Sequence, residues 1–252
     1  MSSFKEFYPD QGKLYGVIQD ILNEEHPHSL VQASSITKWL KDVKGQMLAP
    51  RFYGNQHARR GTVLHAVLTL YLSYKYLWKT FYDVVNFKTL EGDILEDLKP
   101  LVGCVFEVDN EFVQALTLED IKDVVKIAIQ LQELICFKNY TCIFEKQLDF
   151  SDKKILGGTP DLVLFNDDTL VVYDYKFGKT PVKVEANKQL MVYAVMARAA
   201  YAKVRDVKIC ILQPALQQLG KPLEYYDCTI QELDQLHNSL VTLEAEYTRL
   251  TE

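Results

Sequence analysis

Two strand-like runs that flank a turn constrain the fold of this chain more than any other feature of its sequence. Residues 155–165 and 169–177 are rich in β-branched, aromatic and other apolar residues, and the polar triplet Asn166-Asp167-Asp168 separates them. Asparagine and aspartate favour tight turns because their side chains hydrogen-bond to nearby backbone N–H groups. The two runs therefore predict an antiparallel β-hairpin.

This hairpin brings two acidic residues together. With the turn centred between Asp167 and Asp168, as a two- or four-residue loop requires, Asp161 and Asp174 are direct antiparallel partners. Opposed Cβ atoms lie about 4.5–5.5 Å apart, and Lys176 shares the face of Asp174 because side chains alternate along a strand. Opposed carboxylates repel each other unless a cation compensates. The pair therefore predicts a site for Mg²⁺, which binds carboxylates together with waters and substrate phosphates.

Helical or strand-like periodicity surrounds the hairpin on both sides. We expect helices at residues 12–23, 36–44, 57–81, 184–201 and 230–250, a helix that starts near Leu118, and strands at 141–150 and 207–212. The acidic stretch 91–123 is interpreted as a solvated loop before the helix at Leu118. This order of elements predicts an α/β or α+β fold with a mixed sheet packed by helices.

We interpret the 252 residues as one domain rather than two small ones. It is expected to comprise an N-terminal helical region (1–56), a core (57–215) and a C-terminal helix (216–252). With 48% hydrophobic residues, a chain of this length buries a full core without disulfides or structural metals.

The formal net charge of −6 is unevenly distributed. Residues 223–252 contain seven acids against one arginine, whereas residues 34–60 contain six Lys or Arg against one acid. This balance excludes a uniformly basic coat for nucleic acid, but a local basic surface is still compatible with it, because local potential steers a polyanion.

The sequence predicts a cytoplasmic protein that does not enter a membrane. It contains no run of 18 uncharged apolar residues, and its start lacks the basic and apolar segments of a secretory signal. The five cysteines are scattered and form no C-x-x-C pair, which suits buried thiols in a reducing compartment.

The hairpin resembles the core of the PD-(D/E)xK nuclease superfamily, through Gly158-Thr159-Pro160-Asp161 followed by Asp174-Tyr175-Lys176. This resemblance implies a restriction-endonuclease-like α/β core. It further implies that Asp161 and Asp174 bind metal and that Lys176 assists the attacking water. The second acid is Asp here instead of the commoner Glu, which the family permits.

Further matches are similar to the RecB-like subgroup of these nucleases. The segment from Arg60-Gly61 to His65 resembles its R-G-x-x-x-H element, and Gln189-x-x-x-Tyr193 resembles its Q-x-x-x-Y helix. The resemblance implies that His65 is an additional metal ligand. It also implies that Glu145 and the Tyr175 backbone carbonyl contribute to the metal site. A histidine ligand shifts the preference from Mg²⁺ towards Mn²⁺.

The resemblance implies a metal-dependent deoxyribonuclease that hydrolyses phosphodiester bonds with Mg²⁺ or Mn²⁺. Gln189 and Tyr193 would contact the substrate or brace the site. Arg59 and Arg60 are either phosphate contacts near the metal or ordinary surface charges. Similarity to phage-encoded RecB-like proteins suggests an exonuclease of phage DNA replication, recombination or repair in the host cytoplasm. The alternative is a non-catalytic DNA-binding or protein-interaction subunit with the same fold. Cleavage mode, polarity, strand preference, the number of metal ions and assembly as a homo-oligomer or with a phage recombination partner are left open.

We expect no iron–sulfur cluster. Cluster-bearing members of the subgroup carry one cysteine before the core and three after the Q-x-x-x-Y helix. In this sequence only Cys210 and Cys228 follow Tyr193, and no cysteine precedes His65. A cubane cluster needs four thiolates within reach.

Overall fold

The computed structural model describes residues 10–23, 29–49, 55–77, 87–134, 139–201, 204–219 and 223–252. The fold is mixed α/β, as the sequence predicts. The helices are α2 (Gln11–Asn23), α3 (Ile36–Trp39), α4 (Val43–Leu48), α5 (Gln56–Leu77), α6 (Phe87–Leu98), α7 (Leu118–Leu134), α8 (Lys188–Ala200) and α9 (Ile230–Thr251). Short 3-10 turns are η1 (Ala33–Ser35), η3 (Lys99–Leu101) and η5 (Pro214–Leu219).

The central sheet has five strands in the order β10-β9-β8-β7-β4. Their bounds are β4 (Thr141–Phe144), β7 (Leu162–Phe165), β8 (Thr169–Tyr175), β9 (Asp206–Leu212) and β10 (Leu223–Cys228). β8 and β9 are parallel and the other neighbours are antiparallel, which confirms the predicted mixed sheet. Leu162 pairs with Tyr173 and Phe165 with Leu170, which is the predicted hairpin register.

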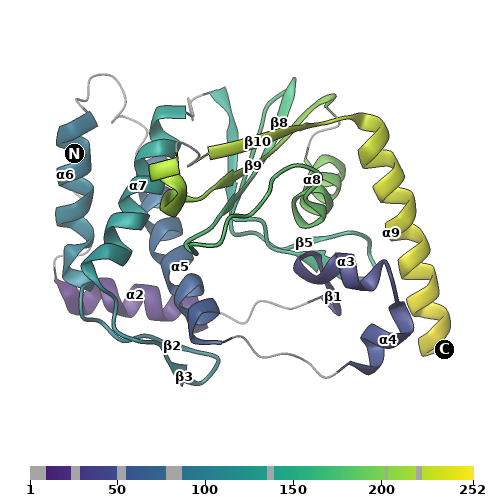
Figure 1. Cartoon of the computed structure of the whole chain (residues 1–252), viewed down its shortest axis with the longest axis horizontal. Coiled ribbons are helices and arrows are strands. Elements are labelled where there is room, and N and C mark those ends of the chain that lie inside the picture. The colour runs from purple at the N-terminus through teal and green to yellow at the C-terminus, as the bar shows by residue number, and fades with distance from the viewer. Residues whose placement is uncertain are drawn as a thin grey trace.

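Helices cover both faces of this sheet (Figure 1). Apolar residues of α2, α5, α6 and α7 form one core with Leu162, Leu164 and the rings of Tyr173 and Tyr175. Apolar residues of α3, α4, α8 and α9 form a second core with Val163 and other strand residues whose side chains point to the opposite face of the sheet. A strand buried on both faces needs a nearly continuous apolar sequence, and this explains why the acid in β8, Asp174, stands out.

Two of the predicted strands are interrupted. The run 155–165 divides into β6 (Leu156–Gly158) and β7, and β6 joins β1 (Val31–Gln32) and β5 (Leu148–Asp149) in a separate three-stranded sheet. Pro160 lies at the break, because proline has no N–H to donate to a ladder. The run 141–150 divides into β4 and β5 after Phe144.

The loop expected in the stretch 91–123 ahead of Leu118 was wrong, whereas the helix expected to start near Leu118 is present as α7. The stretch ahead of Leu118 includes part of α6 and a hairpin of β2 (Glu107–Val108) and β3 (Glu111–Phe112). Ile94 and Leu98 of α6 are one turn apart and fully buried, so α6 is held by tertiary packing while Asp93 and Glu96 are exposed. The helix predicted at 36–44 is split into α3 and α4, and α4 begins where the Asp42 carboxylate accepts a hydrogen bond from the Gly45 N–H.

The sequence analysis also did not anticipate β10. This strand lies at the edge of the central sheet, and its partly exposed polar residues give it only a weak apolar pattern. In the part of the chain that the structure describes, every helix is too short or too polar to cross a bilayer.

Candidate active site

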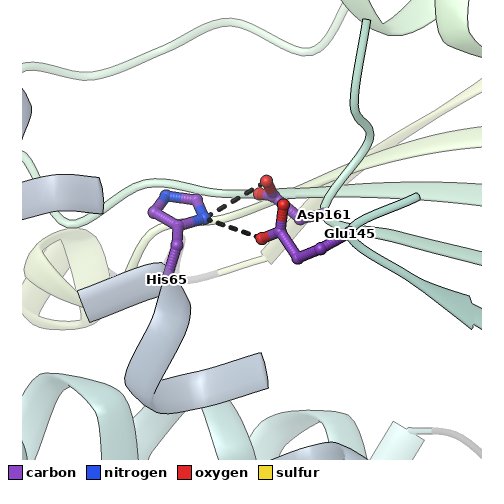
Figure 2. A group of neighbouring side chains, drawn as sticks. All are labelled: His65, Glu145 and Asp161. Carbon is purple, nitrogen blue, oxygen red and sulfur yellow. Dashed lines mark ion pairs between the residues drawn. The ribbon is translucent and has the colours of Figure 1, made fainter. Parts of the chain in front are cut away.

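Three predicted ligands converge from three different elements (Figure 2). His65 projects from α5, Glu145 follows β4, and Asp161 immediately precedes β7. The His65 Nδ1 atom lies 3.1 Å from Asp161 Oδ1 and 3.6 Å from Glu145 Oε1. One potential ligand atom from each residue lies within 4.8 Å of the other two. One imidazole nitrogen and two carboxylate oxygens therefore face a common point.

Asp161 is held between the hairpin and α5. The residue is 7% exposed, and its second carboxylate oxygen accepts a hydrogen bond from the Tyr175 backbone N–H. The first oxygen faces His65. The backbone of β8 thus fixes the orientation of the Asp161 carboxylate before any ligand binds.

Glu145 has an unusual backbone conformation. Its φ angle is 42°, in the left-handed region that residues other than glycine seldom adopt. Its N–H donates to the Asp161 carbonyl oxygen (3.2 Å), and the Thr69 hydroxyl donates to Glu145 Oε1 (3.4 Å). Strained backbone of this kind concentrates at functional sites. The kink after β4 directs the Glu145 side chain towards His65 and Asp161.

Asp174 and Lys176 form the second part of the site. Asp174 is 4% exposed, and Lys176 Nζ lies 2.6 Å from Asp174 Oδ2. Asp174 does not belong to the three-residue cluster, although the sequence predicts it as a direct metal ligand. The hairpin therefore brings Asp161 and Asp174 to the same end of the sheet, where His65 and Glu145 gather around the first and Lys176 contacts the second.

Burial and mutual repulsion shift the pKa values of this group. Burial, reinforced by Asp161, raises the pKa of Asp174 to about 6 despite Lys176. Burial also raises the pKa of Glu145, against the opposing effect of its hydrogen bond with His65. Burial alone lowers the pKa of His65, but the neighbouring Asp161 and Glu145 carboxylates outweigh it and raise this pKa to about 10. This group of described residues thus contains three carboxylates but only two cationic side chains, those of His65 and Lys176, so negative charge is in excess.

This donor set fits a divalent cation. Imidazole nitrogen with carboxylate oxygen is a combination used for Mn²⁺ and similar ions, and oxygen ligands suit Mg²⁺. His65, Glu145 and Asp161 supply three donors, and they line a cavity of about 480 Å³. The first turns of α5 and residues 175–178 complete the walls of this cavity. A substrate could therefore reach the donors.

Gln189 and Tyr193 lie on one face of α8, as predicted, and Gln189 Nε2 donates to Tyr193 Oη (3.2 Å). Tyr193 is buried and packs on Gly158, where an added Cβ would lie only 2.8 Å from Tyr193 Cε1. This contact explains why residue 158 is a glycine, because a side chain there would collide with the Tyr193 ring. The pair supports the segment that leads to Asp161, while its predicted contact with substrate stays a prediction.

Arg59 and Arg60 connect α5 to other elements. Arg59 Nη1 lies 3.0 Å from Glu111 of β3, and Arg60 forms an ion pair with the buried Asp120 of α7. Arg60 also borders the cavity. Both guanidinium groups thus have acidic partners, and their predicted role as phosphate ligands stays a prediction.

Sequence reasoning missed two residues of the site. Thr69 lies one helical turn after His65 and hydrogen-bonds to Glu145. Phe177 packs edge-on against the His65 ring, with ring centroids 5.3 Å apart. The i, i+4 spacing of His65 and Thr69 was a usable signal, whereas the contact of Phe177 depends on how α5 packs against the sheet.

Comparisons with known proteins found a family match and a structural resemblance. Residues 28–252 match a family model described as "Protein of unknown function (DUF2800)". The structure has weak similarity to an alkaline exonuclease (LHK-Exo) from Laribacter hongkongensis, at 16% sequence identity and a TM-score of 0.31. That alignment covers 50% of this chain and 66% of the exonuclease chain.

Proposed function

Because the chain belongs to the DUF2800 family, whose function is unknown, we propose a function from its site: a metal-dependent deoxyribonuclease that hydrolyses phosphodiester bonds. The observation that carries this proposal is the convergence of His65, Glu145 and Asp161 in an open cavity beside the Lys176–Asp174 pair. Hard donors beside a lysine suit hydrolysis of a phosphate ester, in which negative charge develops on oxygen.

His65, Glu145 and Asp161 would hold a Mg²⁺ or Mn²⁺ ion, with Asp174 and the Tyr175 backbone carbonyl as further candidate ligands. When bound, such an ion supplies Lewis-acid charge and activates water. The raised pKa of His65 means that the imidazole must lose its proton for an ion to bind. The hydrogen bond from the Tyr175 N–H keeps the Asp161 carboxylate aimed at this point.

Lys176 would act on the reacting atoms. Its side chain is 29% exposed, lines the cavity and is anchored by Asp174. The ammonium group would orient the attacking water and offset charge on the phosphate. Gln189 and Tyr193 would support the substrate side, and Arg59 and Arg60 would add phosphate contacts.

In its finer form the proposal is a RecB-like PD-(D/E)xK enzyme without an iron–sulfur cluster, acting as an exonuclease in phage DNA replication, recombination or repair. The motifs around His65, Asp161, Asp174 and Gln189 support this form. A single domain of residues 1–252 that works in the cytoplasm is part of the same proposal.

The test is a cleavage assay with Mg²⁺, Mn²⁺ or EDTA on end-labelled single-stranded, double-stranded and closed circular DNA. We expect metal-dependent cleavage that Lys176→Ala abolishes and Lys153→Ala, at an exposed lysine elsewhere, does not. Sparing of circles would identify an exonuclease. If folded protein cleaves none of these substrates with either metal, the proposal is rejected in favour of a non-catalytic DNA-binding or protein-interaction subunit.

A further inference from the structure

The loop that follows Lys176, residues 177–187, leads directly out of the cavity. Phe177 and Gly178 line the cavity wall, and the loop then passes Gln213, the residue after β9, before it reaches α8. A polymer whose bond lies at Lys176 must continue beyond the cavity, and this loop is one of the surfaces that it meets first.

The 177–187 loop is anchored by a buried glutamine. Gln213 follows β9 and is 1% exposed. Its Nε2 donates to the carbonyl oxygens of Gly178 (2.6 Å) and Thr180 (2.7 Å), and its Oε1 accepts from the Val182 N–H (3.1 Å). An amide is costly to bury unless it is hydrogen-bonded. All three bonds here go to the loop backbone, so Gln213 fixes the path of the loop.

The second half of the loop is fixed as well. Val184 is buried in the core beside α8, and the Asn187 side chain donates to the Lys183 carbonyl oxygen (3.0 Å). The loop therefore presents its exposed side chains from a defined backbone, which lowers the entropic cost of binding a ligand.

Two exposed lysines, Lys179 and Lys183, project from this fixed backbone. Within the described ranges neither forms an ion pair, in contrast to the lysines that pair with nearby acids: Lys99, Lys122, Lys126, Lys176 and Lys208. Lys188 differs, because it contributes, after Tyr226 and Thr229, to lowering the pKa of Glu232. The loop thus carries two exposed lysines and one exposed acid, Glu185, next to the candidate active site, so its net charge is positive.

We propose that the 177–187 loop, positioned by Gln213, binds the polynucleotide strand that adjoins the cleaved bond, with Lys179 and Lys183 contacting its phosphates. This inference rests on the proposed nuclease function and extends it to a defined surface. Lys183 itself lines a groove of about 600 Å³, and Glu185 and Glu224 line the same groove. Their carboxylates disfavour a phosphate, so the track of phosphate contacts ends at Lys183.

The test measures binding rather than cleavage. In an Asp174→Asn background with EDTA, the affinity for a fluorescein-labelled single strand and a duplex is followed by anisotropy from 50 to 300 mM NaCl. For the single strand, Lys179→Ala/Lys183→Ala is expected to make the slope of log K against log salt shallower by about 1.4. The affinity at 0.1 M salt should fall roughly twentyfold. Lys13→Ala/Lys153→Ala, which removes the same charge elsewhere, should bind like the parent.

Gln213→Ala should reproduce the shallower slope while both lysines are present, because the loop is released. If Gln213→Ala fails to fold, the lysine variants still decide the question. If the wild type cleaves DNA but the Lys179/Lys183 variant keeps the parent affinity and slope, the loop inference is wrong and the nuclease proposal stands. If the parent binds no polynucleotide and the wild type cleaves none, both are wrong.

Discussion

The β7–β8 hairpin carries two aspartates at each end, and the two pairs lie in opposite environments. At the turn, Asp167 and Asp168 are exposed, and the Asn166 side chain accepts hydrogen bonds from the N–H groups of Asp168 and Thr169. At the open end, Asp161 and Asp174 are almost completely buried. The same residue type is therefore solvated at one end and enclosed with like charges at the other.

The difference separates acids that shape a turn from acids that serve a site. Water solvates the turn aspartates at little cost, whereas buried carboxylates are expensive unless paired. At the open end burial, reinforced by Asp161, raises the pKa of Asp174 to about 6 even though Lys176 is adjacent. A protein that retains such a costly arrangement is expected to use it for binding or catalysis.

The largest expected effect comes from neutralising an acid at the open end of the hairpin, with an acid at the turn as the matched control. Asp161→Asn should lower the rate of metal-dependent DNA cleavage by about 10²–10³-fold or more, because it removes a carboxylate proposed to hold the metal ion that offsets charge in the reaction. Asp167→Asn makes the same chemical change at the turn and should leave the rate unchanged. Initial rates on labelled linear DNA measure both. Equal losses for the two variants would show that hairpin stability, and not the site, controls the rate.

Metal ions should stabilise only proteins with an intact open end. At a concentration one hundred times Kd, Mn²⁺ should stabilise the fold by about 2.7 kcal/mol. This raises Tm by roughly 5–10 °C for a chain of this size. Differential scanning calorimetry should show the rise in wild type and Asp167→Asn but not in His65→Ala. A full rise in His65→Ala would place the metal elsewhere.

The pH dependence of metal binding should report the proton on His65. Asp161 and Glu145 overcome burial and raise the pKa of this imidazole to about 10, so a metal ion must displace a proton at neutral pH. The apparent Mg²⁺ affinity should rise with pH by up to about tenfold per unit between pH 7 and 9. Calorimetry in buffers of different ionisation enthalpy measures the released proton directly, and a value of zero would contradict this role of His65.

In the metal-free protein, the raised pKa of His65 makes the free energy of unfolding decrease as pH rises. The folded-state pKa of His65 lies above its unfolded value, so its contribution is complete below about pH 6.5 and is lost as pH rises through about 10. Urea unfolding of the metal-free protein at pH 7 and 9 should show this decline, and Ala at position 65 should flatten it.

The smallest effect is expected at the turn. Asn166→Ala removes the acceptor of two backbone hydrogen bonds and should lower the free energy of unfolding by about 1 kcal/mol. The cleavage rate should be unaffected, because a separate hydrogen bond from the Tyr175 N–H to the Asp161 carboxylate holds the open end together. A shifted urea midpoint with an unchanged rate is the expected result. A parallel loss of activity would mean that the two ends are coupled.

The sequence by itself determined the features that depend on neighbours along the chain. Asn166 and the two aspartates of the turn set the hairpin register, and this register brings Asp161 close to Asp174. The starts of α7 and α9 were also predictable, because Thr117 and Thr229 cap the helices locally. In each case the deciding hydrogen bonds join residues only two or three positions apart.

Only the tertiary structure decided how the distant residues of the site contact one another and their neighbours. The left-handed backbone at Glu145 could not be read from its neighbours in the sequence. The ion pairs of Arg59 and Arg60, and the hydrogen bonds of Gln213 to the 177–187 loop, join segments far apart in the chain. Helix α6 and strand β10 are likewise held by packing against elements that their own patterns do not specify. Local propensity fixes a backbone over a few residues, whereas the partner of a buried charge depends on which surfaces the folded chain brings together.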